Sequence, residues 1–261
     1  MTADGLTLVG TYFPASVNPA PIVVLMHWAG GDQNDWFAEG LKWPPLALIL
    51  QNRQAELAGR SGRLARPATG NGHSYGVLTF NFRGFPPSEG SFGNGYLDAQ
   101  AAVQFAKTLE GADPDLILTL GASIGADGAV DGCVAPDGSG PACIAAIALS
   151  PGSYIDMDFT QAVRGVGEMP VACIAARGDA PSLDTCQAAE AQAGDSYQVI
   201  LYEGDAHGMM LFGITDQEPL LLDFILEFLG QAVAAHTGLS LIHISEPTRL
   251  LSISYAVFCL K

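Results

Sequence analysis

The stretch LILTLGASIGADG, residues 116–128, decides the fold. Its first five residues form an apolar run that is typical of a strand buried on both faces, and the residues after the serine indicate a helix. Ser123 lies between them, framed by Gly121 and Gly125 in the pattern G-x-S-x-G. A serine on a sharp turn between strand and helix has its hydroxyl pushed out of the sheet, and such a turn needs small residues on both sides. We therefore expect Ser123 to be a nucleophile.

Length and composition favour one α/β domain over residues 1–238, with a mostly parallel central sheet and helices on both faces. The chain has 261 residues, and its 49% hydrophobic fraction is ample for such a core. No apolar run approaches the roughly 20 residues of a membrane span. The formal net charge of −16 would repel phosphate rather than neutralise it, so nucleic acid is excluded as a partner.

A glycine-rich loop follows an earlier apolar strand, which we predict at residues 21–26. The loop reads HWAGG, residues 27–31. A loop of this kind can supply one backbone amide of an oxyanion hole, and the residue after the nucleophile supplies the other. We expect Ala29 and Ile124 to form that pair, with a plain turn as the alternative for the loop. His27 is interpreted as a structural histidine, because it precedes the serine in the chain.

Two later strands run into residue types that would complete a catalytic triad. The strand predicted at 170–176 is followed by Asp179, and the last predicted strand is followed by His207. We prefer Asp179 to Asp184 and Asp205 as the acid, because the end of a strand holds a side chain more rigidly than a loop does. A carboxylate only two residues from the histidine would also struggle to reach the far ring nitrogen. The alternative for Asp179, a helix N-cap, stays open.

These motifs together resemble the α/β-hydrolase superfamily over residues 4–235. The turn RGFPPSEG at 83–90 is loosely similar to the R-G-x-G-x-S-x-G turn of that superfamily, and we expect Arg83 to hold it through an ion pair. About twenty residues separate the strand predicted at 144–151 from the next strand, which predicts no substantial cap domain. The chain is most similar to the cap-poor, dienelactone-hydrolase-like branch. It departs from true dienelactone hydrolases, which have cysteine at the position of Ser123.

The resemblance implies a serine esterase that acts on a small-molecule carboxylic ester, with no metal and no organic cofactor. His207 would remove the proton from Ser123 while Asp179 orients and stabilises the imidazolium. Two alternatives stay open: a serine peptidase or amidase of the prolyl-oligopeptidase-like type, and a non-catalytic binding protein on a hydrolase scaffold. The lack of an access-restricting domain weighs against the first, and the complete triad weighs against the second.

Four residues on loops that face the predicted site are candidates to line a substrate pocket. They are Trp28, Phe85, Tyr154 and Met209. For each of them, ordinary core packing is the alternative.

Four cysteines flank two loops, Cys133 with Cys143 and Cys173 with Cys186. Cysteines that lie close in sequence on either side of a loop favour two disulfides and therefore an exported enzyme. Met1 stands directly before a predicted strand, so an exported enzyme would have its leader missing from this sequence. The alternative is a cytoplasmic protein with four buried thiols. The sequence leaves the oligomeric state open.

The last segment, residues 239–261, does not belong to the predicted domain. LSLIHISEPTR at 239–249 resembles the translation of a sequencing-library adaptor, and ISYAVFCLK at 253–261 resembles the primer that follows it. We interpret the segment as a non-native tail and exclude it from the fold, with a β-rich C-terminal tail as the alternative. The exclusion removes His243 from the catalytic candidates and Cys259 from the disulfide candidates.

Overall fold

The computed structural model describes residues 1–51 and 74–238, and the predicted non-native tail lies outside these residues. Seven strands form one sheet in the order β1-β3-β2-β4-β5-β6-β7. The first pair, β1 and β3, is antiparallel, and all the other neighbours are parallel. This confirms the mostly parallel sheet predicted from the sequence. The strands are β1 (Gly10–Phe13), β2 (Ala20–Met26), β3 (Gly76–Phe80), β4 (Ala112–Ala122), β5 (Ala145–Leu149), β6 (Val171–Ala176) and β7 (Tyr197–Tyr202).

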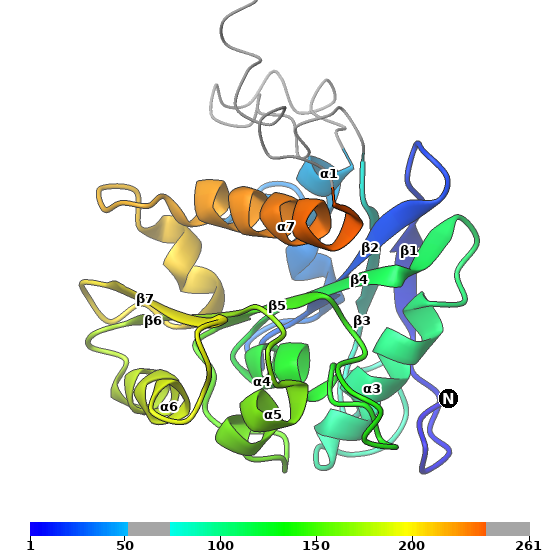
Figure 1. Cartoon of the computed structure of the whole chain (residues 1–261), viewed down its shortest axis with the longest axis horizontal. Helices are drawn as coiled ribbons and strands as arrows, with labels where there is room; N and C mark the ends of the chain where they lie inside the picture. The colour runs from blue at the N-terminus through cyan, green and yellow to red at the C-terminus, as the bar shows by residue number, and fades with distance from the viewer. Residues whose placement is uncertain (52–73, 239–261) are drawn as a thin grey trace, which may run out of the picture.

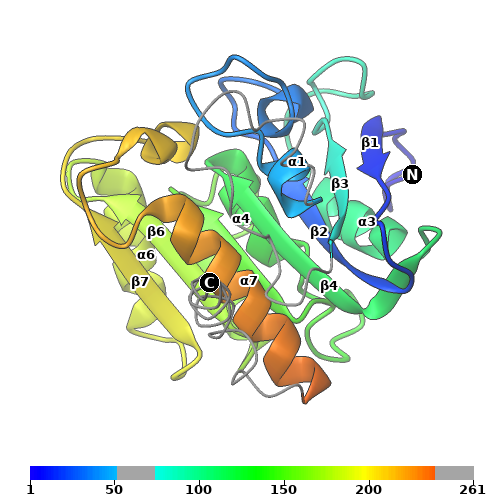
Figure 2. The same cartoon turned by 90° about the horizontal axis from the view of Figure 1, so that it is seen from above.

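Helices cover both faces of the sheet, as the two views in Figures 1 and 2 show. One face carries α1 and α7, and the opposite face carries α3, α4, α5 and α6. Two short 3-10 helices, η1 and η2, lie in the loops after β2 and β7. The bounds are η1 (Gln33–Trp36), α1 (Leu46–Leu50), α3 (Gly95–Ala106), α4 (Ile124–Asp131), α5 (Phe159–Val166), α6 (Ala180–Glu190), η2 (Gly208–Gly213) and α7 (Leu221–Thr237).

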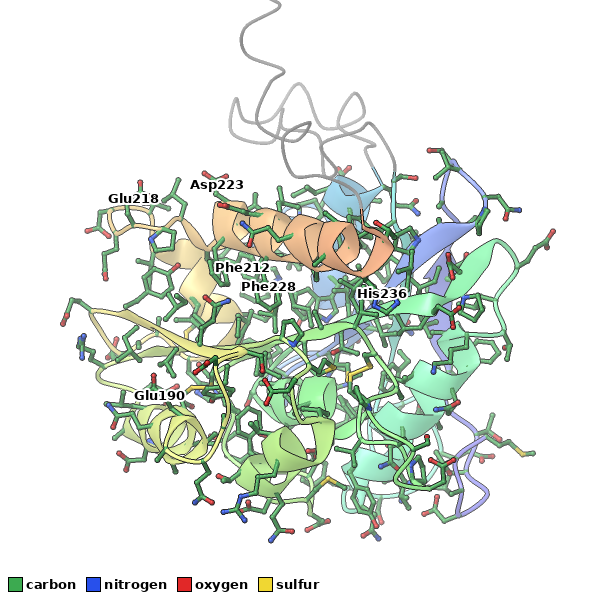
Figure 3. The ribbon with its side chains drawn as sticks, viewed as in Figure 1. Glu190, Phe212, Glu218, Asp223, Phe228 and His236 are labelled. Atoms are coloured by element: carbon green, nitrogen blue, oxygen red, sulfur yellow. A yellow bond between two sulfur atoms is a disulfide. The ribbon has the colours of Figure 1, made fainter. Side chains whose placement is uncertain are left out.

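Each face of the sheet has its own apolar core. Alternate residues of the central strands point to opposite sides, so Ile22 and Val24 pack with α3, α4 and α5, whereas Val23 and Leu25 pack with α1 and α7. Figure 3 shows Phe212 and Phe228 between α7 and the sheet. Continuous apolar runs such as β2 are required here, because both faces of each central strand are buried.

Residues 150–170, all of them described, contain only α5 and its loops between β5 and β6. The connection is therefore too short for an inserted domain, which agrees with the cap-poor architecture predicted from the sequence.

Arg83, in the turn after β3, is buried and forms the expected ion pair. Its guanidinium lies 2.7 Å from a carboxylate oxygen of Asp98 on α3 and 2.7 Å from one of Asp4. The hydrogen bond from Arg83 lowers the pKa of Asp4 to about 2. One cation thus ties the N-terminal segment, the turn after β3 and α3 together.

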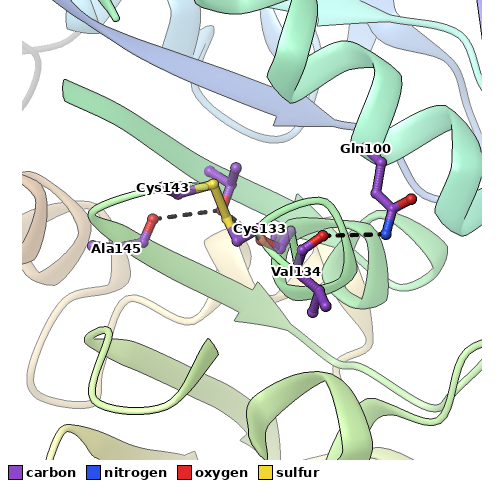
Figure 4. Close-up of a disulfide and its surroundings, with 7 residues drawn as sticks. Gln100, Cys133, Val134, Cys143 and Ala145 are labelled. Atoms are coloured by element: carbon purple, nitrogen blue, oxygen red, sulfur yellow. Dashed lines mark hydrogen bonds between the residues drawn. A yellow bond between two sulfur atoms is a disulfide. The ribbon is translucent and has the colours of Figure 1, made fainter. Parts of the chain in front are cut away.

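Two disulfides link helices to the sheet. Cys133, just after α4, is bonded to Cys143 before β5, and Cys173 in β6 is bonded to Cys186 in α6. Figure 4 shows the first bridge beside the hydrogen bond from the Gln100 amide to the carbonyl of the residue after Cys133. Asp179 lies between β6 and α6, and the second bridge joins these two elements.

This pairing predicts a thiol count. The chain contains five cysteines, and four of them are bridged. Protein denatured without reductant should react with one equivalent of a thiol reagent, at Cys259, and reduced protein should react with five. Mass spectrometry of the labelled peptides identifies the sites. Five reactive thiols without reductant, in protein purified from an oxidising compartment, would contradict the pairing.

Helix α4 buries two carboxyl groups on successive turns, Asp127 and Asp131. Asp127 accepts hydrogen bonds from three backbone amides, whereas neither carboxyl oxygen of Asp131 has a hydrogen-bond partner among the described residues. Burial raises the pKa of Asp131 well above its usual value, and the charges of Asp127 and Asp158 raise it further. Asp131 therefore keeps its proton to a higher pH in the folded protein than in the unfolded chain.

The raised pKa predicts how Asp131→Asn changes stability with pH. An acid whose pKa is higher in the folded state contributes stability below its unfolded pKa of about 3.9, and this stability is lost as the pH rises through the folded pKa. Asparagine does not titrate, so the variant escapes that loss. We expect the difference in Tm between the variant and the wild-type protein to move in favour of the variant as the pH rises from 4 to 8. Thermal unfolding across this pH range checks it, and a gain that grew toward acid would be the wrong sign.

Candidate active site

Ser123 lies on a strained turn between β4 and α4. Its φ is 53° and its ψ is −117°, a conformation that L-residues rarely adopt. The Ser123 amide donates a hydrogen bond of 2.8 Å to the carbonyl of Leu149 at the end of β5, which helps to hold the turn. Ser123 is buried, with 7% of its surface exposed.

The two framing glycines are required by close backbone contacts. A Cβ atom at Gly121 would overlap the carbonyl of Gly125, and one at Gly125 would overlap the carbonyl of Met26 at the end of β2. Both neighbours are backbone atoms, which cannot rotate away as a side chain can. The two glycines of the G-x-S-x-G pattern are therefore needed because larger residues would not fit, as the sequence indicated.

Three predicted residues come together in one line of hydrogen bonds. His207 Nε2 lies 2.8 Å from Ser123 Oγ, and His207 Nδ1 lies 2.7 Å from Asp179 Oδ2. A carboxylate only accepts, so Nδ1 carries the proton and Nε2 is the nitrogen free to accept from the hydroxyl. Asp179 is 10% exposed and His207 is 27% exposed, so water and small molecules can reach the imidazole.

The loops that carry the acid and the histidine are attached to each other. Asp179 follows β6 and His207 follows β7, the neighbouring strand. The amide of Gly178 donates to the carbonyl of Gly204 at 2.7 Å, and the amide of Gly208 donates to Ser150 Oγ at 3.0 Å. Because β6 and β7 are adjacent and their loops are joined, the Asp179 carboxylate lies beside Nδ1 of His207.

His27 takes a structural place, as interpreted from the sequence. Its Nε2 accepts from the amide of Phe82, so its Nδ1 carries the proton and donates to the carbonyl of Trp28 at 2.8 Å. Burial lowers the pKa of His27, which keeps the ring neutral. The ring therefore orients the loop that contains Ala29. Ile124 is the first residue of α4, where the amide has no carbonyl within the helix to donate to.

Two of the four pocket candidates lie beside the Ser123–His207 pair. A Cβ atom at Gly208 would lie 3.3 Å from the Trp28 ring and 3.7 Å from the Ser123 Cβ, so Trp28 and the serine flank this glycine. The Trp28 indole donates to a carboxylate oxygen of Asp35 at 2.7 Å, which fixes its orientation. The Tyr154 ring stands edge-on to the His207 ring, with 6.3 Å between their centroids.

The other two candidates differ. Phe85 packs edge-on against His27, with ring centroids 4.7 Å apart, and so contacts the loop behind the site. Met209 is fully buried in the apolar cluster between α7 and the sheet, so its assignment to the pocket was wrong. The 3-10 turn of η2 directs Met209 inward, and it leaves its neighbour Met210 48% exposed.

Two residues that support the site, Ser150 and Asp127, were not predicted from the sequence. Ser150 accepts from the amide next to His207, and Asp127 binds the loop that carries Tyr154. A serine directly after a buried strand was a weak signal for the first. No sequence pattern indicated the second.

Within residues 1–51 and 74–238, no group of three or more histidine, cysteine, aspartate or glutamate side chains is placed to hold a metal ion. Over the same residues, none of the helices has the length and apolar character needed to cross a membrane.

The close backbone contacts of the turn at Ser123 predict that Gly125→Ala destabilises the protein. The new methyl group would have to displace the backbone of β2, and overpacking of this kind costs about 1–3 kcal/mol or more. Gly230→Ala is the matched control, because a Cβ atom at Gly230 meets nothing within 4 Å and alanine favours a helix. Thermal unfolding should show a clear loss of Tm for the first and none for the second. Equal values would contradict the close contact.

No protein-family model matches the chain, and no curated protein sequence matches it. Solved structures do match. An esterase of Pyrococcus furiosus, Pf2001, has a TM-score of 0.62 and 17% identity over 90% of this chain and 87% of that chain. An esterase of Pyrobaculum calidifontis has a TM-score of 0.57 and 14% identity, over 89% of this chain and 83% of that one. A dienelactone hydrolase from Anabaena variabilis has a TM-score of 0.53 and 14% identity, over 88% and 97%. The chain therefore has the α/β-hydrolase fold.

Proposed function

We propose that this protein is a serine esterase that cleaves carboxylic esters through an acyl-enzyme. The observation that carries the proposal is the hydrogen-bonded line from Asp179 through His207 to Ser123. Three residue types in these roles activate a serine hydroxyl, which is a weak nucleophile on its own. The esterases among the similar structures share the fold at low identity and add support at that level only.

In the proposed reaction, Ser123 Oγ attacks the ester carbonyl while His207 Nε2 takes the hydroxyl proton. Asp179 holds the imidazole by its Nδ1–H and stabilises the imidazolium that forms. The amides of Ala29 and Ile124 donate to the oxyanion of the tetrahedral intermediate. His207 then gives its proton to the leaving alcohol, and a water molecule releases the acid in a second round of the same steps.

The surroundings of the serine favour a small-molecule ester as substrate. Trp28 presents an aromatic wall beside the nucleophile, and Tyr154 presents a second ring beside the histidine. Aromatic walls bind apolar groups without fixing their length. The two disulfides favour an oxidising compartment, so we propose that the enzyme acts outside the cytoplasm.

The proposal predicts the effect of replacing two members of the triad, Ser123 and Asp179. Ser123→Ala should lower kcat/KM for nitrophenyl esters at least about 1,000-fold. Asp179→Asn should lower it by up to about 10,000-fold, because the imidazolium loses its negative partner and the new NH2 group favours the wrong tautomer of His207. Asp184→Asn is the matched control, since Asp184 is exposed on α6 and is not hydrogen-bonded to His207. It should retain wild-type turnover.

The same assay separates esterase from amidase activity. Esters of rising acyl length and the matching nitroanilides are compared at equal concentration. Ester turnover should exceed anilide turnover for every acyl group. Ester turnover retained in Ser123→Ala would remove Ser123 from its role, and faster anilide cleavage would replace the esterase proposal with the amidase one.

A further inference from the structure

The loop after β5 touches both the proposed nucleophile and the proposed base. The carbonyl of Leu149 accepts from the amide of Ser123, and Ser150 Oγ accepts from the amide of Gly208, next to the histidine. The loop is also strained, because Ser150 and Ser153 both have a φ of 59°. Non-glycine residues keep such a conformation only where their surroundings hold them.

Asp127 supplies part of that hold. It is fully buried on α4, one turn after Ser123. Its Oδ1 accepts from the amides of Gly152 at 2.9 Å and Ser153 at 3.1 Å, and its Oδ2 accepts from the amide of Tyr154. Burial raises the pKa of Asp127 to about 7, and the three amide hydrogen bonds oppose that rise. The bonds are therefore charge-assisted, and stronger than bonds between neutral groups, when the carboxyl is ionised above that pH.

The third of these amides belongs to the residue that packs against His207. The Tyr154 ring folds back over Gly152, where a Cβ atom would overlap the phenol ring, and it stands edge-on to the imidazole. The direction of the backbone at residues 152–154 therefore contributes to where the ring lies, together with the contact between the phenol and Ser182 of α6.

We propose that Asp127 is a positioning residue of the active site, which holds the backbone of residues 152–154 so that the Tyr154 ring stays against His207. The inference rests on the proposed esterase function and deepens it. With the ring in place, the imidazole is confined to the orientation in which Nε2 faces Ser123. Asp127 acts through Tyr154 and does not itself touch the reacting atoms.

A purely local role for Asp127 is the competing explanation. An acidic side chain in the first turn of a helix stabilises the helix by itself, through its charge at the positive end of the dipole. That role would lower stability when removed, but it would not act specifically through Tyr154. The test must therefore separate stability from the orientation of the ring.

Asp127→Asn is the sharpest variant. With its oxygen at the Oδ1 position, asparagine keeps the bonds from Gly152 and Ser153 but places an NH2 group against the amide of Tyr154. The flipped side chain would lose two bonds instead of one. We expect kcat for nitrophenyl esters to fall about 10- to 100-fold, the scale of a small misplacement in a catalytic site. Hydrogen exchange of the Tyr154 amide should quicken at least about tenfold.

Asp131→Asn is the matched control, because Asp131 is a buried carboxyl one turn further along α4 whose oxygens have no partner among the described residues. It should leave kcat and the Tyr154 amide exchange at their wild-type values. An equal loss of kcat in both variants would overturn the inference, because it would mean that any buried carboxyl of α4 has the same effect.

Two further variants test the route through the ring. In a Tyr154→Ala background, Asp127→Asn should cause no further loss of kcat, since contacts that act as a unit are not additive. Gly152→Ala should displace the ring without removing a bond to Asp127, and should lower kcat with little change in Tyr154 amide exchange. A full additional loss from Asp127→Asn in the Tyr154→Ala background would overturn the inference.

One readout does not depend on ester turnover. The His207 Hε1 resonance senses the neighbouring Tyr154 ring, so it should shift in Asp127→Asn and in Tyr154→Ala, and stay in place in Asp131→Asn. If the wild-type protein cleaves no ester, the esterase proposal fails, and this resonance together with the amide exchange still decides the placement of the ring. An unchanged resonance and unchanged exchange in Asp127→Asn would overturn the inference.

Discussion

The close contact between the start of α4 and the ends of β2 and β4 is the constraint on which the other features depend. Gly125 lies against the carbonyl of Met26, and Gly121 lies against the carbonyl of Gly125, so the helix can begin directly at the end of its strand. Ser123, between the two glycines, must then take a positive φ, which costs about 1–3 kcal/mol. Burial of the apolar strands on both sides of the sheet offsets that cost.

The parallel sheet turns this local contact into a shared site. Each parallel strand returns through a helix, so all the carboxyl ends lie at one edge, where Ser123, Asp179 and His207 follow β4, β6 and β7. The intervening strand, β5, adds no member to the proposed triad. Its end and the following loop instead contact Ser123, the residue after His207 and the buried Asp127 on α4.

Much of this was predictable from local pattern, and the errors have physical causes. The strands were recognisable because burial on both faces demands continuous apolar runs. The strand predicted at 116–120 is longer in the structure, where β4 begins at Ala112 because this residue pairs with Ala20 of β2. Met209 was misplaced because only the turn of η2 decides which of two adjacent methionines faces the core. The contacts of Asp127 could not be predicted from the sequence, because its partners are backbone amides, which almost every residue type provides.

The sequence by itself determined the sharp turn at Ser123, the chain order of the proposed serine, aspartate and histidine, and the sheet that carries them, because these depend on local volume, periodicity and chain order. Only the tertiary structure decided which aromatic rings stand beside Ser123 and His207, and which carboxyl holds the loop after β5. Those choices depend on distances between segments far apart in the chain. They are made by the packing of α4 and the strand ends, and no local pattern encodes them.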